Sequence, residues 1–347
     1  MRHLAALCTA ALATFAHAQT YLMIPDSGTI DRIMLFDADG NLINQNWLVD
    51  GPPTWDFNTP KDVIQVGNEI WVSDQVADAI FCFSASLTPE YIRTISGGLD
   101  NMRGMGVVGD HVYVSNAGTA NGAPGNAVIK FAFDGTRITH WAAPSSPFDC
   151  TDLNGDVLVP DSTTHRIDRW STNGTYLGVF HAGAIRFPEQ AVVVNTGPAG
   201  AQEVWVAGFT SPHGIYRYDA ESGAQVAYYN VTTSGGRGVH ILPNGDVLFT
   251  EGTAVKRFTP GSTASTVLTA TGMTTQYIGV LTLGASCDGD VNCDGAVNGV
   301  DVEVMELAVG GDLSDFCQPD PDFNQDGAVN GTDVEAVELV VGGAPCP

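Results

Sequence analysis

Two short stretches decide how the C-terminal part folds: DVNCDGAVNGVD at residues 290–301 and DFNQDGAVNGTD at residues 322–333. Each places side-chain oxygens at loop positions 1, 3, 5, 9 and 12, with Gly295 or Gly327 at position 6. A hard cation takes six to eight oxygen ligands, and the glycine permits the sharp turn that such a loop requires. The spacing therefore predicts two copies of one calcium-binding loop of the EF-hand type.

The expected ligands are five side chains and one backbone carbonyl in each loop. For the first ion they are Asp290, Asn292, Asp294, Ala296 (through its carbonyl), Asn298 and Asp301, and for the second Asp322, Asn324, Asp326, Ala328 (through its carbonyl), Asn330 and Asp333. Residues 287–347 contain fourteen Asp or Glu and no Lys or Arg. Such a block is either disordered or neutralised by cations, and here the spacing favours cations.

A short helix is expected after each loop. Val302, Met305 and Val309 recur at helical spacing after the first loop. After the second loop the corresponding residues are Val334, Val337 and Val341. The glycine pairs at 310–311 and 342–343 are typical of helix C-termini.

With its duplicated loop, Asp at position 12 and one helix per loop, residues 287–347 resemble the dockerin family, in its cysteine-bracketed variety on exported bacterial proteins. The resemblance implies a small α-helical domain with two Ca²⁺ ions that docks to a cohesin-type receptor. One feature departs from the family. In cellulosome-type dockerins, loop positions 10 and 11 often hold a Ser/Thr pair, and basic residues follow on the helix. Here they hold Gly299-Val300 and Gly331-Thr332, followed by Glu306-Leu307 and Glu338-Leu339. The identity of the receptor is therefore open, and another wall or surface receptor remains an alternative.

Four of the seven cysteines lie in this tail: Cys287, Cys293, Cys317 and Cys346. Disulfides persist in exported proteins, and four cysteines allow three pairings. We favour Cys287–Cys346, joining the ends of the tail, with Cys293–Cys317 inside it. Cys82 and Cys150 are expected to be buried strand residues without a disulfide.

The N-terminus predicts export. Arg2 and His3 precede a short apolar run, and residues 16–18 have the small-x-small form of a signal-peptide cleavage site, so residues 1–18 are expected to be a signal peptide. No later stretch is long and apolar enough to predict a membrane span. The net charge of −25 argues against nucleic acid or an anionic membrane as a partner. A secreted protein, extracellular or attached to a cell surface, is expected.

Residues 19–284 carry a weaker repeat in which an aliphatic residue precedes an aromatic one by three positions. The six pairs are Ile33/Phe36, Ile80/Phe83, Val128/Phe131, Ile167/Trp170, Ile215/Tyr218 and Val255/Phe258. A second element lies upstream in each unit and ends at Asp26, Asp74, Asn116, Asp161, Gly208 or Glu251. Six units of short β-type runs separated by Gly/Asn/Asp turns predict an all-β, six-bladed β-propeller.

The segment VLVPDSTTHRIDRW at residues 157–170 makes the body resemble NHL-repeat and related six-bladed propellers, a likeness that implies fold rather than activity. The order of elements predicts how the ring closes. The N-terminal segment supplies later strands of its blade, and residues 276–283 supply the first strand of that blade. This closure would remove exposed sheet edges. A seven-bladed ring would need a further unit, which the sequence does not contain.

Two rings of side chains are candidates for a ligand site in the central channel. The residues expected at the starts of the innermost strands are Lys61, Arg103, Phe148, Glu189, Arg237 and Gln276. The residues expected at the ends of the next strands are Asp26, Asp74, Asn116, Asp161 and Glu251. The acidic residues could hold a divalent metal, as in lactonase-type propellers. We favour a structural role, because Asp and Asn at such places cap tight turns.

The sequence therefore predicts a secreted binding or display protein, with a propeller that recognises a glycan or protein and a tail that docks through calcium. The first alternative is an extracellular enzyme, either a metal-dependent lactonase or a polysaccharide hydrolase or lyase. The second is a structural protein of a matrix or wall. No Gly-x-Ser-x-Gly elbow or phosphate-binding loop occurs in the sequence, so catalytic residues cannot be assigned.

Overall fold

The computed structural model describes residues 19–143, 145–195, 197, 200–269, 272–283, 289–318, 321–324 and 328–344. One compact unit spans Thr20–Thr282 and holds the strands, and the two helices lie in a second unit that includes Leu283–Pro347. The expected signal peptide, residues 1–18, lies outside the described residues.

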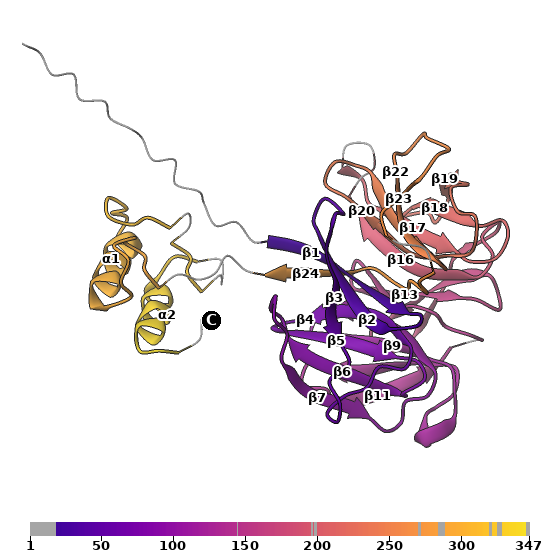
Figure 1. Ribbon diagram of the computed structural model, residues 1–347, viewed down its shortest axis with the longest axis horizontal. Coiled ribbons are helices and arrows are strands. Elements are labelled where there is room, and N and C mark those ends of the chain that lie inside the picture. Colours follow the sequence, from indigo (N-terminus) through magenta and orange to yellow (C-terminus); the bar gives the residue numbers. More distant parts are fainter. Residues whose placement is uncertain are drawn as a thin grey trace, which may run out of the picture. The chain divides into compact units, whose positions relative to one another are not determined.

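The described strands form six four-stranded sheets, the six blades of a β-propeller (Figure 1). The first sheet has the order β24 (Gly279–Leu283), β1 (Gln19–Ser27), β2 (Asp31–Asp37) and β3 (Leu42–Val49). The second contains β4 (Pro60–Val66), β5 (Glu69–Asp74), β6 (Ala79–Ser84) and β7 (Tyr91–Ser96), and the third β8 (Met102–Val108), β9 (His111–Asn116), β10 (Ala127–Ala132) and β11 (Arg137–Ala142). The fourth contains β12 (Thr151–Leu153), β13 (Asp156–Asp161), β14 (Arg166–Ser171) and β15 (Tyr176–Ala182). The fifth contains β16 (Pro188–Val194), β17 (Glu203–Gly208), β18 (Gly214–Asp219) and β19 (Gln225–Tyr229), and the sixth β20 (Gly236–Ile241), β21 (Val247–Glu251), β22 (Ala254–Phe258) and β23 (Thr266–Val267). A short 3₁₀ turn, Ala120–Gly122, precedes β10.

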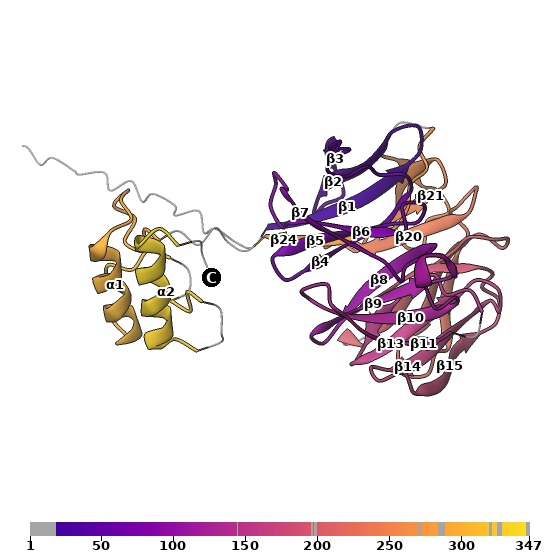
Figure 2. The same ribbon diagram turned by 90° about the horizontal axis from the view of Figure 1, so that it is seen from below.

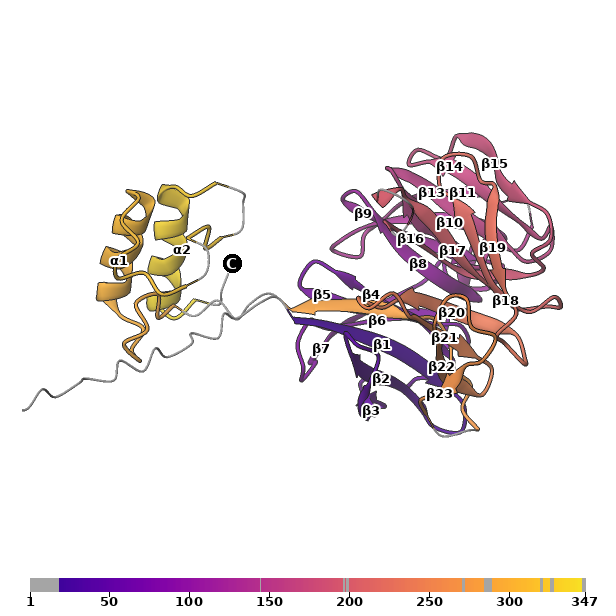
Figure 3. The ribbon, with the colours of Figure 1, turned by 90° about the horizontal axis from the view of Figure 1, so that it is seen from above.

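The ring closes as the sequence predicts, because the last strand of the body joins the first sheet. The orange β24 runs beside the indigo β1 (Figures 1 and 3). The pairing begins before the strand itself, since Gln276 N donates a hydrogen bond to the Pro25 carbonyl (2.9 Å). The six-bladed prediction is confirmed.

The apolar core lies between neighbouring sheets. Each of five clusters of buried side chains takes residues from two adjacent sheets. All twelve residues of the aliphatic/aromatic pairs are buried, and so are Trp71 and Trp205. The repeat arises in the sequence because each sheet needs apolar residues at the same positions to pack against its neighbours.

Crowding at the centre of the ring explains two glycines of the innermost strands. A Cβ atom added at Gly106 would lie 1.9 Å from the Cys150 carbonyl oxygen. One added at Gly279 would lie 1.8 Å from the Val63 carbonyl oxygen. Only glycine allows neighbouring innermost strands to approach this closely.

The tail contains α1 (Gly299–Val309) and α2 (Gly331–Val341), which pack side by side (Figure 2). Met305 and Val337, which belong to the predicted sets of residues at helical spacing, are fully buried in the cluster that joins the helices. The other predicted valines (Val302, Val309, Val334 and Val341) pack against this cluster but are only partly buried. Val304, Ala308 and Ala336 are buried members that the spacing argument did not select.

Both helices end at the predicted glycines, but they begin at loop position 10 rather than after the loop, because the Asn at position 9 caps them. Asn298 and Asn330 are the N-caps, each in a reciprocal capping box with the Asp three residues later. The helices end at Gly310 and Gly342, and the left-handed residues follow at Gly311 (φ 91°) and Gly343 (φ 88°). Within the described residues, no helix has the length and apolar character needed to cross a membrane.

Shortening the chain to end at Thr274 should destabilise the whole body. It removes Tyr277, Ile278 and Leu281 from the core, and each large apolar side chain that leaves a core forfeits about 1.5–3 kcal/mol. It also leaves the inner edge of β1 unpaired. We expect a fall of several degrees or more in the melting temperature, measured by circular dichroism against a chain that ends at Leu283. Equal melting temperatures for the two chains would contradict the closure.

Candidate functional site

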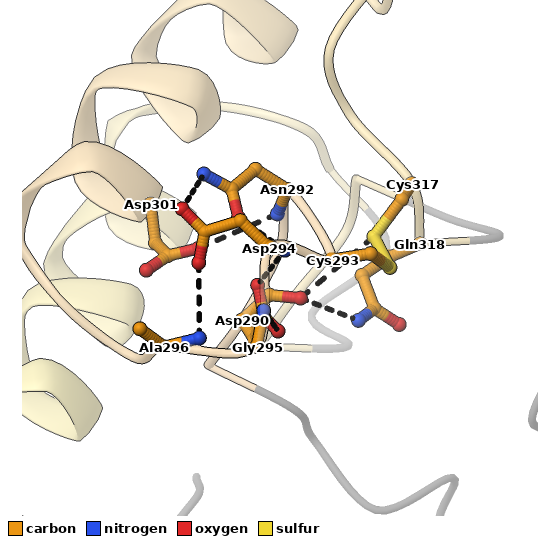
Figure 4. The surroundings of a disulfide bond; sticks show 9 residues. All are labelled: Asp290, Asn292, Cys293, Asp294, Gly295, Ala296, Asp301, Cys317 and Gln318. Carbon is orange, nitrogen blue, oxygen red and sulfur yellow. Dashed lines mark hydrogen bonds between the residues drawn. A yellow bond between two sulfur atoms is a disulfide. The ribbon is translucent and has the colours of Figure 1, made fainter.

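The first loop of the tail is wrapped around its own carboxylates (Figure 4). Asp290 Oδ1 accepts a hydrogen bond from Asp294 N (3.0 Å), and its Oδ2 accepts one from Gly295 N (2.8 Å). Gly295 has φ 90°, as the sharp turn at loop position 6 requires. The carboxylate at position 1 therefore lies within the turn formed by positions 5 and 6.

Asp301, at loop position 12, is hydrogen-bonded to loop positions 3 and 9. Its Oδ1 accepts from Asn292 N (3.3 Å) and its Oδ2 from Asn298 N (2.8 Å). The side chain of Asp301 is fully buried although it lies in the first turn of α1. A buried carboxylate that accepts two backbone N–H bonds is held in a fixed orientation.

The second loop repeats this arrangement where it is described. Asp333 Oδ1 accepts from Asn324 N (3.1 Å), and its Oδ2 accepts from Asn330 N (2.8 Å). Asp333 is also fully buried. Asp326 lies outside the described residues, so the second set of expected ligands is seen only in part.

The donor set of the loops fits a hard cation. Carboxylates, Asn amide oxygens and backbone carbonyls are the ligands that Ca²⁺ takes, and no thiolate or imidazole belongs to the set. In the described parts of the chain, no three His, Cys, Asp or Glu side chains converge as a ready-made metal cluster. The carboxylates of the first loop accept hydrogen bonds from backbone N–H groups of the same loop, and these carboxylate oxygens would be the ligands of a bound ion.

A disulfide joins Cys293, within the first loop, to Cys317, with a Cα–Cα distance of 6.0 Å. Cys317 N donates to the Val291 carbonyl (2.9 Å), so the segment after α1 returns to the loop (Figure 4). The inner pairing that we favoured is confirmed. The outer pairing, Cys287–Cys346, falls on residues outside the described part. Cys82 and Cys150 are buried and unpaired, although Cys150 precedes β12 rather than lying in a strand.

In the propeller, the residues predicted at the starts of the innermost strands do come together. Lys61 Nζ donates to Glu189 Oε2 (2.7 Å), which belongs to the opposite sheet, and to Gln276 Oε1 (2.9 Å). Arg237 Nη1 reaches the same carboxylate at 3.5 Å. Lys61 and Glu189 are each only 1% exposed. An ion pair therefore crosses the middle of the ring out of reach of solvent.

Tyr277 makes a second connection across the ring. Its hydroxyl donates to the Phe148 carbonyl of the opposite sheet (2.9 Å), and its ring lies 4.5 Å from Lys61 Nζ. Burial lowers the pKa of Lys61 to about 8, with Glu189 opposing that effect and Arg237 adding to it. The ring is thus filled by side chains where these residues meet.

Sequence reasoning missed three polar residues that link neighbouring sheets. Asp62 Oδ2 accepts from Met105 N (2.7 Å), and Asp149 Oδ2 accepts from Ala191 N (2.9 Å). Gln190 Oε1 accepts from the backbone N–H groups of the next two sheets around the ring, at Val239 and Ile278 (3.0 Å each). Each of the three directly follows a predicted channel residue, and that position was the available signal.

Burial raises the pKa of the Asp62 carboxyl to about 7. Burial and the Asp62 charge raise the pKa of Asp149 well above its ordinary value. These two carboxyls serve as acceptors for the inner strands in a dry environment.

The acidic residues at the ends of the second strands are engaged with backbone and basic groups. Asp74 accepts from the N–H groups of residues 58, 59, 76 and 77. Asp161 accepts from those of residues 146, 163 and 164. Asp26 pairs with Arg32 (2.8 Å), and Glu251 pairs with Lys256. The ring is assembled at one end of the propeller, and its oxygens anchor turns.

Residues 288–339 match the family model described as the dockerin type I domain. The tail is a dockerin type I domain. Domains of this family bind calcium and dock to cohesins in extracellular complexes. The match covers both loops of the dockerin, the whole of α1 and most of α2.

The body resembles solved propeller structures. A chain in the "Crystal structure of Nidogen/Laminin Complex" has 13% sequence identity and a TM-score of 0.58, and the alignment covers 76% of this chain and 98% of that chain. A protein of unknown function from Bacteroides caccae has 13% identity and a TM-score of 0.52, with 76% and 99% covered. Identities this low show the fold alone. No curated protein matches the sequence.

Replacing Glu189 with Ala should cost about 3–5 kcal/mol of unfolding free energy at neutral pH, because it leaves Lys61 charged and buried. The deficit should shrink as the pH rises towards about 8, because Glu189 raises the pKa of Lys61. Without Glu189, the folded variant loses its lysine proton at a lower pH than the folded wild type, in which the pKa of Lys61 is about 8. Chemical denaturation at several pH values measures both effects.

Arg169→Ala is the matched control for this prediction. Arg169 pairs with Asp156 at 2.6 Å, but its side chain is 34% exposed, so its removal should cost no more than about 1 kcal/mol. Equal losses for Glu189→Ala and Arg169→Ala would show that the central pair does not hold the ring together.

Proposed function

We propose that this protein is secreted and anchored through its dockerin, and that the propeller is a rigid recognition body displayed by that anchor. In this proposal residues 1–18 are a removable signal peptide, residues 19–284 the propeller and residues 287–347 the dockerin. The observation that carries the proposal is the duplicated loop within the dockerin match, with the same capping box at the start of each following helix.

Each loop of the dockerin would hold one Ca²⁺ ion. The proposed ligands are those named from the spacing, with the carbonyls of Ala296 and Ala328 at position 7. The buried carboxylates of Asp301 and Asp333 support this assignment, because their backbone hydrogen bonds orient them towards the rest of the loop. Calcium would neutralise carboxylates that repel one another and so would stabilise the helices that begin at position 10.

The docking face is proposed to include the exposed apolar residues of both repeats. Val300 is 46% exposed, Leu307 48% and Leu339 62%. Exposed glutamates lie beside them, at 303 and 306 on α1 and at 335 and 338 on α2, and the tail contains no Lys or Arg. A cohesin that fits this face would offer an apolar surface rimmed by basic residues.

The geometry of the propeller favours recognition over metal-dependent hydrolysis. The acidic residues that a lactonase-type metal would need are occupied with turn N–H groups and with Arg32 and Lys256. The middle of the ring is closed by the buried Lys61–Glu189 pair. A matrix role in which the propeller binds another protein is the competing form of the same proposal.

Replacing Asp290 and Asp322 together with Ala should abolish capture by a cohesin while leaving the propeller folded. Each change removes the position-1 ligand, and a charged oxygen ligand contributes on the order of 1.5–3 kcal/mol, so calcium affinity should fall by at least about tenfold in each loop. Capture on an immobilised cohesin and calcium titration of the full chain measure the two effects.

Asp312→Ala with Asp315→Ala is the matched control, because it removes the same charge from exposed positions outside the loops. Leu307→Glu with Leu339→Glu should keep calcium binding and lose capture, which separates the docking face from the metal loops. Capture that survives loss of calcium from both loops would place docking elsewhere.

A further inference from the structure

Three of the chain's fourteen Lys and Arg residues lie together where the innermost strands begin. Lys61, Arg103 and Arg237 come from the second, third and sixth sheets, and the two arginines belong to opposite sides of the ring. Both arginines act electrostatically on Lys61. In a protein of net charge −25, a group of three neighbouring cations suggests that they have a specific role.

Both arginines use Nη1 for their contacts and leave the same donors unused. Arg103 Nη1 donates to Ser146 Oγ (2.7 Å) and to the Pro147 carbonyl (3.1 Å). Arg237 Nη1 donates to Gln276 Oε1 (3.2 Å). In both, Nε is buried and finds no hydrogen-bond acceptor among the described residues, and Nη2 makes no hydrogen bond or ion pair within the described part of the chain.

The unused edge is the one that recognises carboxylates. The Nε–H and Nη2–H groups of a guanidinium point in parallel and match the two oxygens of a carboxylate. A buried donor without an acceptor costs free energy, and a ligand is one explanation for such a group. The side chain of Arg237 is 21% exposed, so this end of the ring is open to solvent.

A row of aromatic rings connects the two arginines. The Arg103 guanidinium lies 3.8 Å from the centre of the Phe148 ring, and that of Arg237 lies 4.7 Å from the centre of Phe209. Phe187 lies between the two rings, 4.7 Å from Phe148 and 5.2 Å from Phe209. Phe187 and Phe209 are only partly buried, so the row offers an apolar surface beside the cations.

Phe187 is placed by an unusual backbone conformation. Its φ is 53°, in the left-handed region that bulky residues rarely adopt. Its N–H donates to His165 Nδ1 (3.2 Å), and its carbonyl accepts from Phe209 N (3.0 Å). The surroundings therefore fix a strained residue whose ring bridges the other two.

We propose that this end of the ring, between Arg103 and Arg237, binds a ligand that carries a carboxylate next to a flat apolar face. The carboxylate would meet the unused edge of an arginine, and the flat face would lie on the phenylalanine row. The C–H face of an acidic sugar and the ring of an aromatic acid both have this chemistry. The inference rests on the proposed recognition role of the propeller and names the ligand class for it.

The acidic groups near the three cations are already engaged, so the positive charge is not fully neutralised. Glu189 is shared by Lys61 and Arg237, and Asp161, which also acts on Arg103, accepts three backbone N–H bonds. Burial lowers the pKa of Lys61 to about 8, and the two arginines add to that effect. A bound carboxylate would offset the repulsion among the three cations.

The test is calorimetric titration of the full chain with three probes: trigalacturonate, the neutral galactose trimer and benzoate. We expect heat from at least one carboxylate probe and none from the neutral trimer. Arg237→Met and Arg103→Met should each weaken that binding roughly 10- to 100-fold, as expected for the loss of a charge-assisted hydrogen bond. Arg169→Met, which removes the cation of β14 that pairs with Asp156, should leave it unchanged.

Binding of trigalacturonate assigns an acidic sugar, and binding of benzoate alone assigns an aromatic acid; either supports the site. No heat from either carboxylate, equal binding of the neutral trimer, or full affinity in both arginine variants would overturn it. If an arginine variant does not fold, Phe209→Leu replaces it, since loss of the ring should also weaken binding. Cohesin capture by the same samples is the separate readout, because a failed propeller site leaves dockerin docking intact.

Discussion

The constraint on which the body depends is that a ring of sheets must have no free inner edge. The last strand returns to the first sheet, and β24 beside β1 meets this requirement. Six innermost strands then crowd the centre, which explains why Gly106 and Gly279 carry no Cβ. The crowding also strips solvent from the polar side chains that point inward, so each needs a partner from another sheet. Lys61 with Glu189, Tyr277 with Phe148, and Asp62 with Met105 are those partners.

The two parts of the chain are stabilised in different ways. The propeller buries a series of apolar clusters between its sheets, and a core of this size can stabilise the fold without a metal or disulfide. The dockerin has one small cluster around Met305 and Val337, one described disulfide and two loops of acidic residues. A domain of this size commonly needs a metal or disulfides to fold. In the proposed function, calcium would therefore control attachment without disturbing the propeller.

Much of the fold could be predicted from the sequence, because the features that were used are local. The Ile33/Phe36 type of pair marks the same buried positions in every blade, and Gly310 marks the end of a helix, whereas the N-cap role of Asn298 was not predicted. The starts of the innermost strands were also recognisable, and Lys61 and Glu189 do meet across the ring. Asp62 and Asp149 escaped notice because their partners, Met105 and Ala191, lie in the next sheet and are backbone groups that leave no mark in the sequence. For the same reason the row of Phe148, Phe187 and Phe209 is visible only in three dimensions.

The central claim is that calcium belongs to the dockerin and that the acidic ring of the propeller is structural. A calorimetric calcium titration of residues 19–347 beside residues 19–283 tests it most directly. The account predicts two ions bound by the longer chain and none by the shorter one. In the propeller, Asp26 and Glu251 are paired with Arg32 and Lys256, and Asp74 and Asp161 hold turns of separate sheets. Uptake of an ion by the shorter chain would contradict the account and would make the end of the ring a candidate catalytic centre.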